Sequence, residues 1–122
     1  MDLRVAEVRA QGDETKEEVV IRVKNDCNLA GYMIFDETFK SDGTVSNKHR
    51  HVFIFPDWEV KEDDHIFVRT RVGKDAKGKT KQGTPAHYFY FGLNSPVWNE
   101  EGDKVHLIKI EKSIEFRVSR VV

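Results

Sequence analysis

The sequence contains one cysteine, Cys27, among 122 residues. A single cysteine excludes an intrachain disulfide and any CxxC metal or redox site. The neighbouring Asp26 and Asn28 would raise the pKa of the thiol, which favours a partly buried cysteine over a reactive one. The cysteine content therefore leans only slightly toward a reducing compartment such as the cytoplasm.

Long apolar runs are missing as well. No stretch of about 18 apolar residues occurs, so the sequence predicts no membrane-spanning helix. Residues 1–18 lack the apolar core of a signal peptide. We therefore expect a soluble chain, although a leader removed from a mature protein would leave no trace here, and secretion stays open.

Neither sign of charge dominates the composition. The 20 basic and 21 acidic residues leave a formal net charge of -1 and a pI near 6.5. This balance excludes a globally basic nucleic-acid binder but leaves room for a local basic patch. Apolar residues at 39% and aromatic residues at 11% are typical of a globular protein. The length is that of one domain with one core, so we expect residues 1–122 to form a single domain.

Short segments rich in β-branched and aromatic residues recur along the chain, separated by Gly, Asp and Pro turns. No window carries apolar residues at i, i+3, i+4 and i+7 over three helical turns. Eight strands are predicted, at residues 3–8, 18–23, 31–36, 51–55, 65–72, 88–91, 104–110 and 114–118. Residues 73–85 form the longest segment without a strand and are expected to be a mobile loop. This pattern predicts an all-β sandwich or barrel.

Several of these segments match a known order of motifs. They are LRVAEV at residues 3–8, EVVIRVKN at 18–25, LAGYMIFD at 29–36, FIFPD at 53–57 and VWNEEGDKVHL at 97–107. Together they resemble the lamin-tail domain, the module at the C-terminus of nuclear lamins, with relatives in bacterial and archaeal proteins. Three departures are Tyr32, where Trp is typical, Trp58, where Gly is typical, and residues 111–113, EKS, where an Asp-x-Gly hairpin turn is typical. The resemblance implies an immunoglobulin-like β-sandwich of about eight strands that serves as an interaction module.

The segment VWNEEGDKVHL places three carboxylates and a histidine within seven residues, 100–106. General acid–base catalysis needs carboxylates held at a fixed separation in a cleft, whereas the adjacent Glu100 and Glu101 of a turn diverge. No Gly-x-Ser-x-Gly elbow occurs elsewhere. We therefore expect no enzymatic activity, with Trp98 packed across the sandwich. The predicted core consists of Phe53, Phe55, Phe67, Phe89, Phe91, Trp98, Val105, Leu107 and Phe116.

Residues 69–81 carry the clearest indication of binding. They contain six basic residues and one acidic residue, Asp75, which gives this segment a charge of +5. A flexible basic loop beside His87 and the aromatic residues 88–90 favours phosphate contacts and base stacking. A lysine-rich loop that is merely solvated is the alternative. The predicted polyanion-binding residues are Arg69, Arg71, Lys74, Lys77, Lys79 and Lys81.

Residues 73–80, written GKDAKGKT, satisfy the GxxxxGK[ST] pattern of a phosphate-binding loop. That loop requires a parallel strand before it and a helix after it, so that the helix N-terminus meets the phosphate. The following KQGTP cannot begin a stable helix. The sequence therefore argues against nucleotide hydrolysis.

His49 and His51 are two residues apart and would share one face of a strand, as zinc ligands sometimes do. A third ligand is identifiable only if the strands bring His65, His87 or Asp57 beside them. We therefore expect no metal site and no cofactor. The sequence favours a non-catalytic module for protein binding or assembly, with binding of DNA or another polyanion through residues 69–81 as the alternative. It specifies neither the partner nor the oligomeric state.

Overall fold

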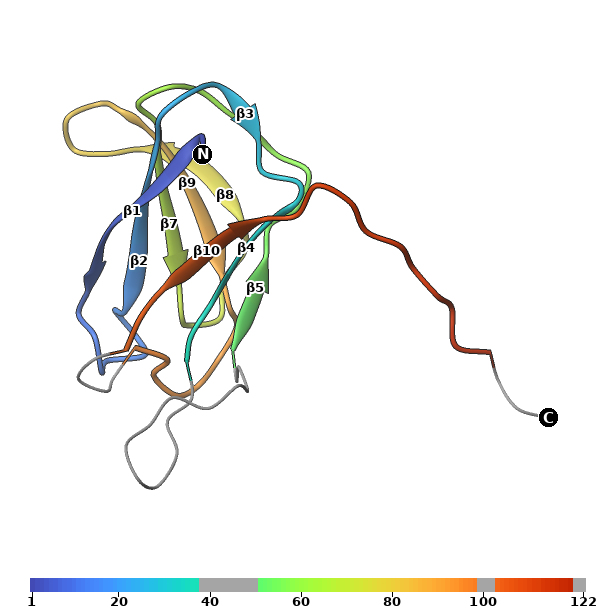
Figure 1. Ribbon diagram of the computed structural model, residues 1–122. Coiled ribbons are helices and arrows are strands. Elements are labelled where there is room, and N and C mark those ends of the chain that lie inside the picture. Colours follow the sequence, from blue (N-terminus) through green and yellow to red (C-terminus); the bar gives the residue numbers. More distant parts are fainter. Residues whose placement is uncertain (38–50, 99–102, 120–122) are drawn as a thin grey trace.

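The computed structural model describes residues 1–37, 51–98 and 103–119, and within them the chain is all-β (Figure 1). The strands are β1 (Leu3–Arg9), β2 (Glu18–Val23), β3 (Cys27–Asn28), β4 (Tyr32–Phe35), β5 (Val52–Ile54), β6 (Glu59–Val60), β7 (His65–Arg69), β8 (Ala76–Lys79), β9 (Pro85–Tyr90) and β10 (His106–Lys109). No helix that could cross a membrane is found in this part of the chain. The predicted all-β sandwich is confirmed.

Two sheets form the layers of the sandwich. The large sheet has the order β1-β2-β7-β9-β8, and the small sheet has the order β10-β4-β5. All pairings are antiparallel except that of β7 with β9, which is parallel. A two-stranded pair, β3 with β6, adds a short third sheet. These two-residue strands escaped prediction because two residues carry too little alternation to detect.

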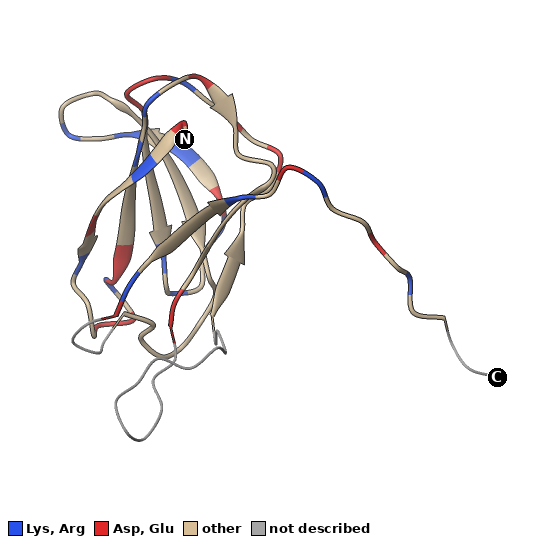
Figure 2. Ribbon diagram, in the orientation of Figure 1, with Lys and Arg blue, Asp and Glu red and all other residues tan. Residues whose placement is uncertain are grey.

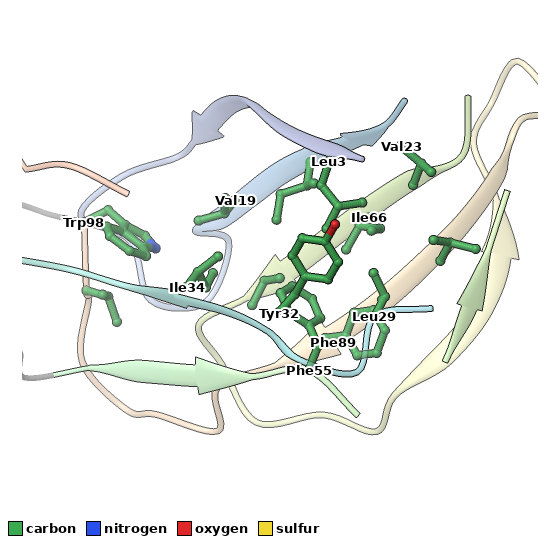
Figure 3. Close-up of a cluster of buried hydrophobic side chains, with 14 residues drawn as sticks. Leu3, Val19, Val23, Leu29, Tyr32, Ile34, Phe55, Ile66, Phe89 and Trp98 are labelled. Carbon is green, nitrogen blue, oxygen red and sulfur yellow. The ribbon is translucent and has the colours of Figure 1, made fainter. Parts of the chain in front are cut away.

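Period-two alternation explains which side chains fill the space between the sheets. Val19 and Ile21 of β2 and Ile66 and Val68 of β7 are fully buried on the inner face of the large sheet. Tyr32, from the small sheet, reaches into the middle of this core, near Leu3, Ile66, Phe55 and Phe89 (Figure 3). One continuous core therefore joins both layers.

The predicted core is largely confirmed. Phe55, Phe89 and Trp98 are buried between the sheets, whereas Phe53, Phe91, Val105 and Leu107 are half-buried against them. Phe67 is also buried, but in a separate cluster with Val20 and Ala86. The prediction is wrong for Phe116, whose side chain is 90% exposed.

Two predicted segments differ in the structure. Residues 73–85, expected to lack a strand, contain β8, and β9 already begins at Pro85. Gly and Lys hid β8 from a reading of propensity, because its pairing with β9 comes from the hairpin rather than from apolar alternation. Residues 114–118, expected to be a strand, belong to no sheet. They lie in an extended segment that leaves the sandwich after β10 (Figure 1).

A buried carboxylate fastens the segment at Val97 and Trp98 to the large sheet. Glu17 is fully buried and accepts hydrogen bonds from the amides of Gly12, Val97 and Trp98, at 2.9, 2.8 and 3.3 Å. The Thr70 hydroxyl donates a fourth, at 2.6 Å. Four donors compensate the desolvation of the charge. This arrangement positions Trp98 at one end of the core, near Val19 and Ile34 (Figure 3).

Cys27 lies on β3 and is half-buried. Burial is the main cause that raises the pKa of its thiol, and the charge of Asp2 adds to it. The predicted partial burial of Cys27 and the predicted rise of its thiol pKa are therefore confirmed.

Candidate anion-binding site

The outer face of the large sheet carries aromatic and cationic side chains instead of a plain polar surface. Because Ile66 and Val68 point into the core, the alternation of β7 turns His65, Phe67 and Arg69 outward. On β9, the same parity places Ala86 and Tyr88 beside Phe67. The parallel pairing of β7 with β9 thus aligns aromatic residues from segments about twenty positions apart in the sequence.

The aromatic rings stack along this face. The centroids of Phe67 and Tyr88 are 5.3 Å apart with an interplanar angle of 16°. His65 stacks on the other side of Phe67, with centroids 6.0 Å apart and an angle of 10°. Phe67 is only 6% exposed, so this column is a small second core and not an open surface.

Arg69 covers the Tyr88 end of the column. Its guanidinium carbon lies 4.5 Å from the Tyr88 centroid, and its Nη1 donates to the Tyr90 hydroxyl at 3.1 Å. Its Nε donates to Glu18 across the β2–β7 pair, also at 3.1 Å. Burial works to lower the pKa of Arg69, but the hydrogen bonds to Glu18 and Tyr90 outweigh it and raise the pKa. Arg69 therefore stays charged in place.

Arg9 lies against Phe67, the middle ring of the column. Its guanidinium carbon lies 5.8 Å from the Phe67 centroid, a cation–π arrangement. It also pairs with Glu7 at 2.7 Å and with Glu18 at 3.6 Å. Glu18 is thus shared between Arg9 and Arg69, one on each neighbouring strand.

The turn between β8 and β9 forms one wall of a concavity on this face. Thr80, Lys81 and Gln82 of the turn, together with the sheet residues, enclose a concavity of about 400 Å³. Three hydrogen bonds hold the turn. Thr80 N–H donates to the Thr84 carbonyl at 2.8 Å, Gly83 N–H donates to the Thr80 carbonyl at 2.9 Å, and Thr84 N–H donates to the Thr80 hydroxyl at 3.2 Å. The lining residues are Arg9, Glu18, His65, Phe67, Arg69, Thr80, Lys81, Gln82 and Tyr88.

Two glycines allow the hairpin to approach the rings. A Cβ at Gly73 would lie 2.4 Å from the Tyr90 ring, and a Cβ at Gly78 would lie 3.1 Å from the Tyr88 ring. Any larger residue at Gly73 would therefore displace Tyr90. Residues 73–79 therefore lie close against the rings of β9.

The concavity is cationic. Arg9, Arg69 and Lys81 line it and Glu18 is the single carboxylate among the lining residues, which leaves three positive charges against one negative. Beside it, Arg22 Nε and His65 Nδ1 are buried and have no hydrogen-bond partner in the part of the chain that the structure describes. Burial lowers the pKa of His65, and the charges of Arg22 and then Arg9 lower it further. A bound anion would relieve this positive field and supply acceptors.

The six predicted polyanion-binding residues do not form one site. Arg69 and Lys81 line the concavity, and Arg71 stands beside it, 5.2 Å from the Tyr90 centroid. Lys77 lies over Trp58 at 5.3 Å, because alternation on β8 turns it to the face opposite Gly78. Lys79 is two residues further along β8 and points to the same face as Lys77. Lys74 is exposed but does not line the concavity. The contiguous basic loop is thus divided between two faces of the hairpin.

Sequence reasoning missed the residues that come from other strands. Arg9, Arg22 and His65 join the site only through the register of β1, β2 and β7. The alternation His65-Phe67-Arg69 was the one available signal, since three consecutive outward positions of β7 are aromatic or cationic. Without the strand order, nothing in the sequence links it to the turn at Lys81.

His87 is excluded from the role of a stacking partner. It is 5% exposed, its Nδ1 accepts a hydrogen bond from Trp58 Nε1 at 2.9 Å, and its Nε2 lies 2.8 Å from an Asp64 oxygen. Because Nδ1 is the acceptor, the proton is on Nε2 and is donated to Asp64. The histidine ties β9 to the chain before β7 and cannot reach a ligand.

The other weak candidates give no metal site among the described residues. His51 is paired with Asp36, its Nδ1 lying 2.8 Å from the carboxylate, while His49 lies outside the described residues. Where residues 1–37, 51–98 and 103–119 are concerned, no three His, Cys, Asp or Glu side chains gather as metal ligands would. The GKDAKGKT segment contains β8 and is followed by β9, so the strand–loop–helix arrangement of a nucleotide-binding loop is not formed.

The chain matches no protein-family model, no curated protein and no solved structure. The resemblance to lamin-tail domains therefore stays a prediction. Support for a function comes from the geometry of the outer face of the large sheet.

Proposed function

We propose that this chain is a non-catalytic interaction module whose concave outer face binds a polyanion, with nucleic acid as the ligand class. The observation that carries the proposal is the concavity itself, in which Arg9, Arg69 and Lys81 converge from β1, β7 and the β8–β9 turn. The two arginines lie over the rings of Phe67 and Tyr88, which pre-organises their guanidinium groups for phosphate.

The geometry favours contacts to phosphate over stacking with bases. Phe67 is almost fully buried, and the Tyr88 face is already covered by Arg69. What remains accessible is the outer edge of the guanidinium groups and the Lys81 ammonium. Binding through these groups is independent of base sequence and depends strongly on salt. This differs from the base stacking on residues 88–90 that the sequence suggested.

A non-catalytic role is proposed because Glu18 is engaged. It is the single carboxylate among the residues lining the concavity and it pairs with both Arg9 and Arg69. A carboxylate that already pairs with two arginines is not free to contact a substrate as a general acid or base.

The test is fluorescence anisotropy of labelled single-stranded and duplex DNA, titrated with the full chain over a salt series. Three cations at the site predict a slope of log affinity against log salt of about -2 to -3. Lys81→Gln should weaken binding and reduce the slope by about one cation's share. Lys79→Gln is the matched control, because it removes the same charge from the same hairpin on the other face.

Equal losses for Lys81→Gln and Lys79→Gln would assign binding to the loop as a whole and overturn the proposed site. Absence of binding at low salt would overturn polyanion binding altogether.

Protein binding or assembly, the function that the sequence favours first, is the second candidate. A different surface supports it, namely the outer face of the small sheet, where Val52, Ile54 and Ile108 are 45%, 69% and 37% exposed. Exposed apolar groups that share one face of a sheet are typical of an interaction site.

A further inference from the structure

Residues 111–119 extend away from the sandwich and carry an unused strand pattern (Figure 1). Ile114, Phe116 and Val118 alternate with Glu115 and Arg117, and the three apolar side chains are 98%, 90% and 87% exposed. In an extended chain these three share one face. A fully apolar strand face in water is unfavourable, so the segment needs a partner.

The edges of the sandwich differ in how they are protected against pairing with another strand. β1 has an irregularity between Val5 and Glu7 and carries charged Arg4, Glu7 and Arg9. β8 carries Lys77 and Lys79. Bulges and edge lysines are the usual means by which a sheet edge avoids further pairing. Both edges of the large sheet are therefore closed to an added strand.

The edge at β5 has no such protection. β5 consists of Val52, Phe53 and Ile54, and it is the terminal strand of the small sheet in the described chain. Among all residues of β4, β5 and β10, Lys109 is the single charged one, as the nearly uncoloured strands of Figure 2 show. Among residues 1–37, 51–98 and 103–119, no strand pairs with the outer edge of β5, and exposed apolar side chains lie beside that edge.

The register of the small sheet shows where an added strand would fit. His106, Phe35 and Val52 form one row across the outer face. Ile108, Met33 and Ile54 form the next row. An antiparallel strand with Ile114 beside Ile54 and Phe116 beside Val52 would continue both rows with apolar residues. The spacing of the segment thus matches the spacing of the rows.

We propose that residues 114–118 of one copy of the chain add as an edge strand to β5 of a second copy, and that two copies exchange these strands reciprocally. The added strand supplies backbone hydrogen bonds to the β5 edge, and its alternate side chains lie against Val52 and Ile54. A second copy is the occupant because the segment stands clear of its own sandwich, with its apolar side chains in solvent (Figure 1). Reciprocal exchange makes a closed two-fold dimer. The inference deepens the assembly function and does not depend on polyanion binding.

The test is the mass of the full chain in solution, measured by light scattering after gel filtration over a range of concentrations. The wild type should pass from 14.2 kDa to twice that mass as the concentration rises. Phe116→Asp removes the donor strand, and Ile54→Asp removes the acceptor edge, so each variant should stay monomeric. Both side chains are exposed, so the circular dichroism and melting of each monomer should be unchanged.

Val72→Asp is the matched control, because Val72 is 66% exposed and belongs to neither strand. It should dimerise like the wild type. A mixture of Phe116→Asp and Ile54→Asp should recover a heterodimer, because the first variant keeps an intact β5 edge and the second keeps an intact donor strand. Hydrogen exchange should show protected amides at residues 114–118 in the dimer.

Three results would overturn the inference. They are a wild type that stays monomeric at millimolar concentration, a dimer that Phe116→Asp leaves intact, and a monomer in which the amides of residues 114–118 are protected. The last result would mean that the segment docks on its own sandwich. None of these results depends on the DNA titrations. This inference can therefore fail while the polyanion site stands, and the reverse also holds.

Discussion

The two outer faces of this sandwich both carry outward-pointing apolar side chains, but those side chains are covered on one face and exposed on the other. On the large sheet, Phe67 and Tyr88 point outward but are covered by Arg9, Arg69 and the β8–β9 turn. On the small sheet, Val52 and Ile54 point outward and stay exposed. An outward-pointing apolar side chain is thus shielded from solvent where neighbouring strands supply cations and a loop. Where they do not, the side chain stays exposed and is available to a partner.

The comparison extends to how each sheet is fastened. Glu17 binds the large sheet to the segment at Val97 and Trp98, and the pair of His87 with Asp64 binds β9 to the chain before β7. The outer face of the small sheet relies on half-buried aromatic residues such as Phe35, which stacks on His106 with centroids 4.9 Å apart. The large sheet is therefore the layer fastened by buried polar contacts, and the small sheet is the layer to which we assign association.

The largest effect should come from removing the fastening of the large sheet. Glu17→Ala leaves three buried donors and the part-buried Gly12 amide without their acceptor, so the free energy of unfolding should fall by about 3–5 kcal/mol. Urea denaturation measures the change. The control is Glu62→Ala, an exposed glutamate whose loss should change stability by less than about 0.5 kcal/mol. A loss for Glu17→Ala no greater than the control would contradict the role of this carboxylate.

The second prediction compares the two outer faces directly. Phe67→Ala should lower the free energy of unfolding by about 3 kcal/mol, because the side chain is buried although it points outward. Ile54→Ala, on the other face, should change the stability of the monomer by less than about 0.5 kcal/mol. Denaturation at low concentration, where the chain is monomeric, measures both. Equal losses would abolish the distinction between a covered and a bare face.

A smaller effect is expected from the cover itself. Arg69→Gln removes the ion pair with Glu18 and the contact with Tyr88, so the free energy of unfolding should fall by about 1–2 kcal/mol. Arg71→Gln, which lies over Tyr90 without a described ion pair, should cost less. At 1 M salt, the difference between the stability losses of the two variants should become smaller, because screening weakens the Arg69–Glu18 pair. A gap that does not respond to salt would assign the effect to packing alone.

The smallest effect concerns pH. The pKa of His65 is lowered by burial, Arg22 and Arg9, so the unfolded chain binds the proton more readily than the folded chain. The stabilisation from neutral His65 is full above pH 6.5 and is lost as the pH falls through the lowered folded-state pKa. His65→Gln should flatten the dependence of the urea midpoint between pH 7.5 and 5.5.

The same histidine reports on the site. NMR titration of the His65 ring should show its pKa rising when single-stranded DNA is bound, because phosphate offsets the field of Arg22 and Arg9. An unchanged His65 pKa under saturating DNA would place the ligand away from the concavity.

Much of the fold is predictable from local pattern. The β-branched and alternating residues of β2 and β7 identified these strands, and the large apolar side chains at Phe55, Phe89 and Trp98 identified the core. β8 was missed because its lysines and glycine carry no apolar alternation. The candidate site was only half predicted, since Arg69 and Lys81 were named but Arg9 and His65 were not.

The division has a physical cause. Alternation and side-chain volume act within a few residues, so the sequence alone established the all-β class, most strands and most of the core. Whether Lys77 joins Lys81 or faces away from it depends on strand register and sheet order, which arise from contacts between segments far apart in the chain. Residues 114–118 show the same limit. Their pattern predicts a strand with one apolar face, but the strand with which it can pair depends on the tertiary structure.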